Sequence, residues 1–172
     1  MRRWAGALAL TALLAACATP RAPGPGDESL GGRLSVQVAA HAGQAPRSMS
    51  ATFELRGNAE RGELDLSSPL GQTMAKARWA PARAELLTGD GERSFPDLQS
   101  LAQEALGEAL PLAALVEWLH ARPWSGAPSV RSDSGFEQLG WLVNLERAAE
   151  GWIVATRSAA PPVTVRARID DR

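Results

Sequence analysis

Residues 48–55 read Ser-Met-Ser-Ala-Thr-Phe-Glu-Leu, and apolar and polar side chains alternate strictly along this stretch. The apolar positions are Met49, Ala51, Phe53 and Leu55. A period of two places these four side chains on one face of a β-strand and the polar ones on the other. One buried face and one solvent-exposed face are typical of antiparallel sheets. The stretch therefore predicts a half-buried strand.

Similar strand signals recur along most of the chain. They predict strands at residues 33–38, 63–66, 73–79, 84–88, 141–146, 151–156 and 163–170, and a short one ending near Phe95. Turn residues rich in Gly, Pro, Asn and Asp separate several of these segments. Many short strands with one apolar face each predict a mainly antiparallel sheet.

The middle of the chain changes to a helical period. A first helix is expected to start near Pro96 and to stop at Gly107. Pro111 is well placed as the first residue of a second helix. Its apolar residues are spaced i, i+3, i+4 and i+7 and form one stripe, namely Leu112, Leu115, Val116 and Leu119.

The expected fold class is mainly β, with α and β elements in one domain. A strongly curved antiparallel sheet wrapped partly around the two helices satisfies the pattern. A small closed barrel filled by its own side chains satisfies it equally well. A sheet that is not completely filled would enclose an apolar cavity. By alternation, the candidate lining residues are Leu34, Val36, Phe53, Leu64, Leu66, Leu115, Leu119, Trp141 and Val143.

The first residues have the features of a bacterial secretory signal. Arg2 and Arg3 precede a short apolar run over residues 4–14, and small residues follow. This run is too short for a stable membrane-spanning helix. We therefore expect residues 1–16 to be a signal peptide that is removed.

Cys17 follows the sequence Leu14-Ala15-Ala16, which is typical of a lipoprotein processing site. Its thiol would carry diacylglycerol through a thioether, and its new amino group would take a further acyl chain. Two or more chains anchor a protein stably to a membrane. In the bacterial sorting scheme that this signal resembles, Asp after the cysteine retains a lipoprotein in the inner membrane. Ala18 therefore predicts the outer membrane.

Residues 17–31 are expected to form the lipidated cysteine and a Pro- and Gly-rich tether, and residues 32–172 the folded domain. The formal net charge of -1 provides no general attraction to nucleic acid. Two distant histidines and one cysteine make no recognisable metal site. Without a nucleophile motif or a phosphate-binding loop, the sequence predicts no enzyme and no cofactor beyond the covalent lipid. A lipid-active enzyme would need a nucleophile and a base brought together by the fold.

One loop has an unusual residue at its tip. Pro69 and Gly71 favour a turn between two strands, and Leu70 stands between them, where a polar residue is common. An exposed leucine can insert into lipid or into the apolar surface of a partner. It can equally fold back onto its own sheet, and the pattern alone favours neither interpretation.

Five short motifs occur in an order and at a spacing that resemble the LolB family of outer-membrane lipoprotein receptors. They are Gly32-Arg33-Leu34-Ser35-Val36, Ser68-Pro69-Leu70-Gly71-Gln72-Thr73, the helical stretch 106–123, the stretch 136–143, and Arg166-Ala167-Arg168-Ile169-Asp170. The resemblance begins at about Gly32 and continues to the C-terminus.

The resemblance implies an incomplete antiparallel β-barrel whose open side is covered by helices. Its apolar cavity would accept the acyl chains of lipoproteins delivered by the periplasmic carrier LolA. The protein, expected as a monomer facing the periplasm, would insert this cargo into outer-membrane phospholipid. Leu70 would correspond to the leucine of the family's protruding loop. The alternative is a non-catalytic structural or assembly lipoprotein of the same fold, its interior filled by its own tryptophans.

Overall fold

The computed structural model describes residues 29–106 and 110–170. The expected signal peptide, Cys17 and the tether up to residue 28 lie outside the described residues, as does Gly107. All the helices and strands described below lie between residues 29 and 170. Residues 18–172, referred to below as the soluble domain because they lack the expected signal peptide and Cys17, contain every helix and strand that the structure describes.

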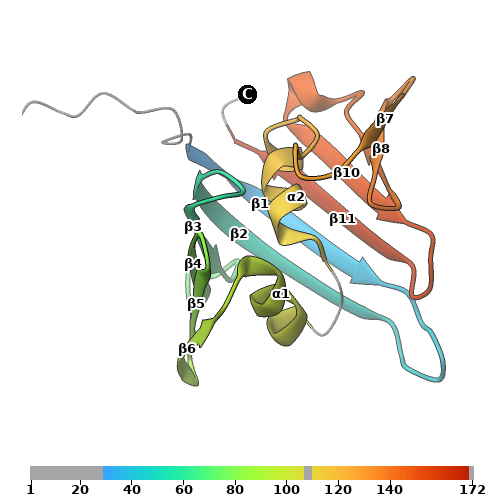
Figure 1. Ribbon diagram of the computed structural model, residues 1–172. Coiled ribbons are helices and arrows are strands. Elements are labelled where there is room, and N and C mark those ends of the chain that lie inside the picture. The colour runs from blue at the N-terminus through green and yellow to red at the C-terminus, as the bar shows by residue number, and fades with distance from the viewer. Residues whose placement is uncertain (1–28, 107–109, 171–172) are drawn as a thin grey trace, which may run out of the picture.

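A single antiparallel sheet of eleven strands forms most of the domain (Figure 1). The strands are β1 Ser29–Val38, β2 Arg47–Gly57, β3 Gly62–Ser67, β4 Thr73–Ala80, β5 Arg83–Thr88, β6 Gly91–Phe95, β7 Ser129–Ser132, β8 Gly135–Gln138, β9 Trp141–Asn144, β10 Trp152–Arg157 and β11 Val163–Ile169. Their order across the sheet is β6-β5-β4-β3-β2-β1-β11-β10-β9-β8-β7. The first and last strands of the chain are therefore neighbours at the centre of the sheet.

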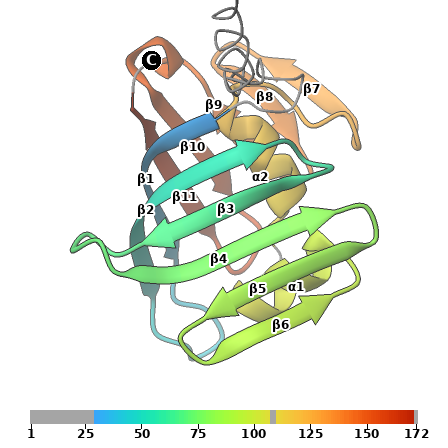
Figure 2. The same cartoon turned by 90° about the vertical axis from the view of Figure 1, so that its left-hand side faces the viewer.

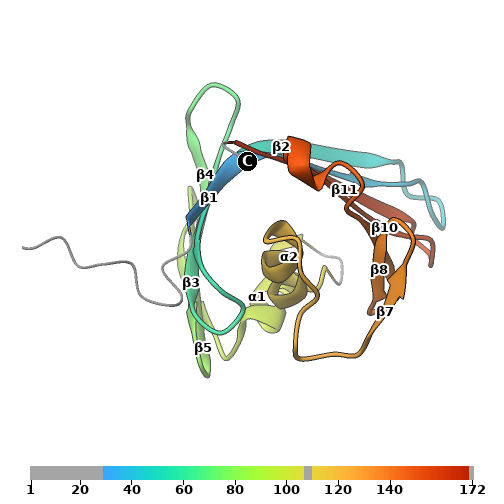
Figure 3. The ribbon, with the colours of Figure 1, turned by 90° about the horizontal axis from the view of Figure 1, so that it is seen from above.

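The two edge strands, β6 and β7, are not paired with each other among the described residues. The sheet is strongly curved but stays open on this side, as the view from above shows (Figure 3). This confirms the incomplete curved barrel. The alternative of a small closed barrel is wrong, because closure would require β6 and β7 to form a ladder.

Two helices occupy the concave side of the curved sheet (Figure 3). They are α1 Leu98–Leu106 and α2 Leu112–Leu119. In the chain, both helices follow β6 and precede β7, the two edge strands of the sheet. They therefore lie at the open side of the sheet. The Asp97 side chain caps α1, because its Oδ1 accepts a hydrogen bond from the Ser100 N–H at 2.7 Å.

β1 starts three residues before the boundary expected at Gly32, because residues 29–31 pair with the end of β2. The two glycines at 31 and 32 conceal this part of the strand from a pattern of apolar side chains. At Gly32, an added Cβ would lie 2.1 Å from the Arg168 carbonyl oxygen. A glycine here lets β1 approach β11 closely, so it marks a tight strand contact and not a break.

Two short strands, β7 and β8, were not expected from the sequence. Each has four residues, and β7 consists of Ser-Val-Arg-Ser, without an apolar face. β9 ends at Asn144, two residues before the expected end at residue 146. The next residue, Leu145, donates its N–H to the Ser134 carbonyl oxygen at 2.7 Å. A short 3-10 turn, Ala148–Glu150, then leads into β10.

Candidate acyl-chain pocket and exposed loop

All nine residues expected to line a cavity belong to the apolar interior or pack against it. Four are buried, namely Phe53, Leu119, Trp141 and Val143. The other five are partly buried and pack against this core, namely Leu34, Val36, Leu64, Leu66 and Leu115. The alternation therefore assigned the correct face of each strand, and the structure brings these side chains together.

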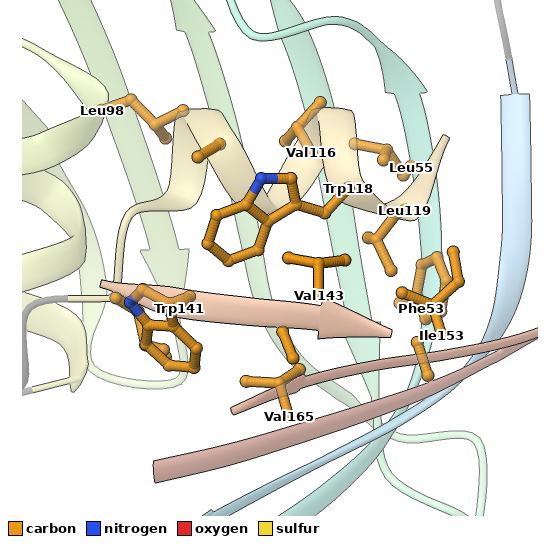
Figure 4. Close-up of a cluster of buried hydrophobic side chains, with 14 of the residues drawn as sticks. Phe53, Leu55, Leu98, Val116, Trp118, Leu119, Trp141, Val143, Ile153 and Val165 are labelled. Carbon is orange, nitrogen blue, oxygen red and sulfur yellow. The ribbon is translucent and has the colours of Figure 1, made fainter. Parts of the chain in front are cut away.

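The centre of the interior is filled by aromatic rings (Figure 4). Trp118 of α2 is 1% exposed, and its ring centroid lies 5.8 Å from that of Trp141 and 6.5 Å from that of Phe136. Tilted and edge-to-face pairs at these distances are favourable beyond the area that they bury. The buried candidates at this level therefore contact other side chains and leave little free volume.

Free volume lies at one end of the sheet instead. A mainly apolar pocket of about 210 Å³ is lined by Val36, Val38, Met49, Ala105, Leu110 and Val163, with Arg47 and Ser48. It lies between the ends of β1, β2 and β11 on one side and Ala105 and Leu110 on the other. Of the nine candidates only Val36 lines it. Val38, Met49 and Val163 share the alternating inner faces, so the same pattern contained their signal.

Two arginines lie at this end of the sheet. Arg157, Val163, Val38 and Arg47 form one row across β10, β11, β1 and β2. Side chains opposite one another on neighbouring strands point to the same face, so both guanidinium groups share the face of the pocket. Arg157 lies over the Trp141 ring, 5.4 Å from its centroid. Arg157 also donates to the Pro161 carbonyl oxygen at 3.2 Å and does not line the pocket, so Arg47 is the cationic hydrogen-bond donor at the end of the pocket.

Gln138 of β8 fixes α2 and the loop after it. Its Oε1 accepts hydrogen bonds from Trp118 Nε1 and the Trp124 N–H, both at 2.9 Å. Its Nε2 donates to the carbonyl oxygens of Trp124 and Ala127 at 2.7 and 2.8 Å. The buried amide is thus fully satisfied, and it connects the helix to the β7–β9 side of the sheet.

Glu117 connects α2 to the opposite side of the sheet. Its Oε1 accepts the Ala59 N–H of the β2–β3 turn at 2.9 Å, and its Oε2 accepts Arg122 Nε at 2.6 Å. Burial alone would raise the pKa of Glu117, but these hydrogen bonds and the positive charge of Arg122 lower it below the ordinary value. The carboxylate is therefore held in its charged form.

The loop between β3 and β4 holds Leu70 away from the protein. The Gly71 N–H donates to the Ser68 carbonyl at 2.8 Å, and the Ser68 N–H donates to the Gln72 carbonyl at 2.8 Å. Gly71 has a φ of +81°, which glycine adopts without strain. The tip is consequently closed on itself, and Leu70 is 89% exposed. The structure thus shows the exposed leucine and not the one folded back.

In the two described segments, no three His, Cys, Asp or Glu side chains are grouped so that they could hold a metal ion. No helix among those residues is both long enough and apolar enough to cross a membrane.

Together, the fold and the site define a binding protein for apolar ligands, in which a half-open barrel and two helices enclose an apolar pocket. The chain belongs to the family of the outer membrane lipoprotein LolB, whose family model matches residues 29–169. This confirms the resemblance that the five motifs indicated.

Several relatives carry the name outer-membrane lipoprotein LolB. The protein of Bordetella petrii is 36% identical over 161 residues, which cover 86% of this chain and 79% of the relative. That of Cupriavidus pinatubonensis is 37% identical and covers 92% of this chain and 80% of the relative. The protein of Cupriavidus necator is 34% identical, and the match covers 93% of this chain and 91% of the relative.

Proposed function

We propose that this protein is an outer-membrane lipoprotein receptor of the LolB type. It accepts lipoproteins from the periplasmic carrier LolA, holds their acyl chains in the half-barrel and inserts them into the outer membrane. The observation that carries the proposal is the apolar pocket between the curved sheet and the helices, in a chain that belongs to this family.

The physical reason for such a receptor is the insolubility of acyl chains. Each methylene that leaves water contributes about 0.8 kcal/mol, so lipoproteins do not cross the periplasm unaided. A series of sites with increasing affinity moves the cargo without a nucleotide or a cofactor. Arg47 at the end of the pocket would donate hydrogen bonds to the carbonyl oxygens of the acyl linkages. It would thereby compensate the desolvation of these polar groups.

The anchor proposed for the receptor is its own lipid. Diacylglycerol and an N-acyl chain on Cys17 would hold the domain at the periplasmic face of the outer membrane, and no other non-protein group is required. The Pro- and Gly-rich tether before β1 would keep the domain close to its destination and raise its effective concentration there. Leu70 would then enter the bilayer during delivery.

The size of the pocket bears on the alternative of a structural or assembly lipoprotein. Trp118 and Trp141 fill the centre, as that alternative required, but the end of the interior stays hollow. Pockets for drug-sized ligands have volumes of about 300–1,000 Å³, so a pocket of about 210 Å³ must widen to accept acyl chains. The apolar contacts of α1 can rearrange for this without breaking a buried hydrogen bond of its side chains.

A pocket-filling substitution tests the proposal. Val36→Phe adds a ring inside the pocket, and Val154→Phe adds the same ring on the outer face of β10. We expect the soluble domain with Val36→Phe to bind a fluorescent triacylated lipopeptide several-fold more weakly than the wild type, and Val154→Phe to bind it normally. Equal binding by both folded variants would exclude this pocket as the acyl-chain site.

A further inference from the structure

The outer face of β1 and β11 carries an excess of positive charge. Alternation along the two strands places Arg33, Arg166 and Arg168 outward, and all three are exposed. Arg33 and Arg168 lie directly opposite one another in the antiparallel register. Like charges in opposite positions destabilise a strand pair. Folding stability therefore does not explain this arrangement.

Carboxylates neutralise this face only in part. Glu54 of neighbouring β2 already pairs with Arg56 at 3.1 Å. Glu150 at the opposite margin pairs with Arg147 at 2.6 Å and also attracts Arg168 electrostatically, and Asp170 follows Arg168 on the same outward side. Within the part of the chain that the structure describes, Arg33, Arg166 and Arg168 form no ion pair, and Arg166 only donates to Gln37 Oε1 at 3.0 Å. Since the whole chain has a net charge of -1, the positive excess is a local property of this face.

An aromatic ring lies among these charges. Trp152 of β10 is half-buried on the same outer face, beside Arg168 in the register. The guanidinium carbons of Arg147 and Arg168 each lie 5.6 Å from the centroid of its ring. Tryptophan with neighbouring arginines is the composition that proteins place at the level of lipid headgroups.

The exposed leucine loop stands on the same side of the molecule. Figure 2 and Figure 3 both show the β3–β4 loop extending beyond the outer face of β1, β2 and β11, away from the helices. A flat surface that touches this outer face therefore meets the tip at Leu70 as well. A bilayer fits both features, because it offers anionic phosphates at its surface and acyl chains beneath them.

We infer that the outer face formed by Arg33, Arg166, Arg168 and Trp152 binds the phosphate groups of anionic phospholipids. This contact lays the convex side of the half-barrel on the membrane and directs Leu70 into the bilayer. The inference goes beyond the receptor function and takes from it only the membrane as the place of delivery.

Vesicle binding tests this surface. The soluble domain of residues 18–172 would be sedimented with vesicles of phosphatidylcholine alone or mixed with phosphatidylglycerol. We expect preference for the anionic vesicles and loss of binding as salt is added. The triple variant Arg33→Gln, Arg166→Gln, Arg168→Gln should lose about five-fold per arginine, on the order of a hundred-fold altogether.

A matched control variant removes three positive charges from another part of the surface. The triple variant Arg61→Gln, Arg78→Gln, Arg83→Gln affects the β2–β3 turn, β4 and β5, and it should retain most of the binding. The single variant Arg33→Gln should be at least as thermostable as the wild type, because it relieves the repulsion with Arg168. Reduced thermostability of Arg33→Gln would contradict the unfavourable pairing from which the inference starts.

Two outcomes would overturn the membrane assignment. One is equal loss of vesicle binding in both triple variants, which would make the effect one of total charge. The other is unchanged vesicle binding in the first triple variant together with weaker capture by the loaded carrier, which would assign the face to an acidic protein. Lipopeptide uptake in solution is measured separately, so failure of the receptor proposal would remain distinguishable from failure of this one.

Discussion

At the scale of single residues, α2 is held over the open side by polar groups that the sequence pattern did not reveal. Gln138 has all four of its amide hydrogen-bonding positions occupied in a buried place. Glu117 is similarly buried and paired. A buried glutamine and an exposed one have the same letter in the sequence, so only the fold distinguishes them. The sequence signal for Gln138 was its place in the stretch 136–143, one of the five motifs of the family resemblance, which predicted no structural role for this side chain.

Replacing Gln138 by Leu should destabilise the domain strongly. The substitution leaves Trp118 Nε1, the Trp124 N–H and two carbonyl oxygens without their partner, and each such group costs about 1–3 kcal/mol when buried. Because neighbouring groups will rearrange, we expect a loss of about 2–4 kcal/mol in the free energy of unfolding. Urea denaturation measures this loss. Gln103→Leu, at an exposed position of α1, should change it by less than about 0.5 kcal/mol.

A substitution that introduces one charge at position 70 tests whether Leu70 enters the membrane. Leu70→Glu places a carboxylate where the proposal requires an apolar group in the bilayer. Delivery of cargo to vesicles should fall several-fold, whereas uptake of cargo in solution should be unchanged because the tip is remote from the pocket. Leu87→Glu, an exposed leucine on β5, is the matched control. Equal loss of delivery and uptake, or loss of neither, would speak against a membrane tip.

At the scale of elements, α2 bridges the two sides of the open sheet. Gln138 connects it to β8, and Glu117 connects it to the turn before β3. α1 is held differently, through apolar residues such as Leu98 and Leu101 and an exposed ion pair of Arg93 and Glu104 at 2.8 Å. An exposed pair contributes little to stability. We therefore expect α1, and not α2, to rearrange when the pocket at its end widens.

The connection through Glu117 predicts a dependence of stability on pH. Its pKa is lowered in the folded state from the ordinary 4.5, so its contribution is complete above pH 4.5 and is lost as the pH falls through the folded value. Glu117→Gln should cost roughly 1 kcal/mol at neutral pH, since solvent screens the half-exposed Arg122. Unfolding curves at several pH values measure the difference from the wild type.

This difference should persist from neutral pH to about pH 4.5 and shrink below it, because the carboxylate then takes up a proton. Glu150→Gln removes an exposed carboxylate that also pairs with an arginine, and its effect should be smaller. A difference that stays constant down to strongly acidic pH would show that the charge of Glu117 does not stabilise the fold.

The elements that could be predicted are those with a strong period. β2 and β11 alternate over seven or more residues, and α1 starts at Leu98, directly after its capping Asp97. α2 starts at Leu112, one residue after the Pro111 that was expected to be its first residue. β7 could not be predicted, because its four residues have no apolar face and are ordered by pairing with β8. The pocket was placed too centrally for a related reason. Alternation identifies the inner face, but it does not show where along that face Trp118 fills the space.

At the scale of the whole molecule, one pairing determines the architecture. β1 and β11 come from opposite ends of the described chain and pair over seven residues at the centre of the sheet. This leaves β6 and β7 as the edges and brings the helices between them into the opening. Local patterns contain no information on such a distant pairing, so the sequence indicated the curved sheet but left the closed barrel possible.

The surfaces proposed for uptake and for delivery lie on different sides of the curved sheet. The interior would bind apolar groups, and the outer side carries both the leucine tip and the arginine face. Uptake and delivery are thus assigned to separate surfaces, which explains why the variants above should affect one step and spare the other. The predictions on uptake and delivery of cargo presuppose that cargo enters this domain.

The most direct test of that central claim is a transfer assay in solution. LolA loaded with a radiolabelled lipoprotein would be mixed with the soluble domain of residues 18–172, and the final owner of the cargo determined by pull-down. We predict that the cargo moves onto the domain, and that Val36→Phe reduces this movement. Cargo that stays on the carrier, while the domain is shown to be folded, would contradict the receptor function and favour a structural lipoprotein of the same fold.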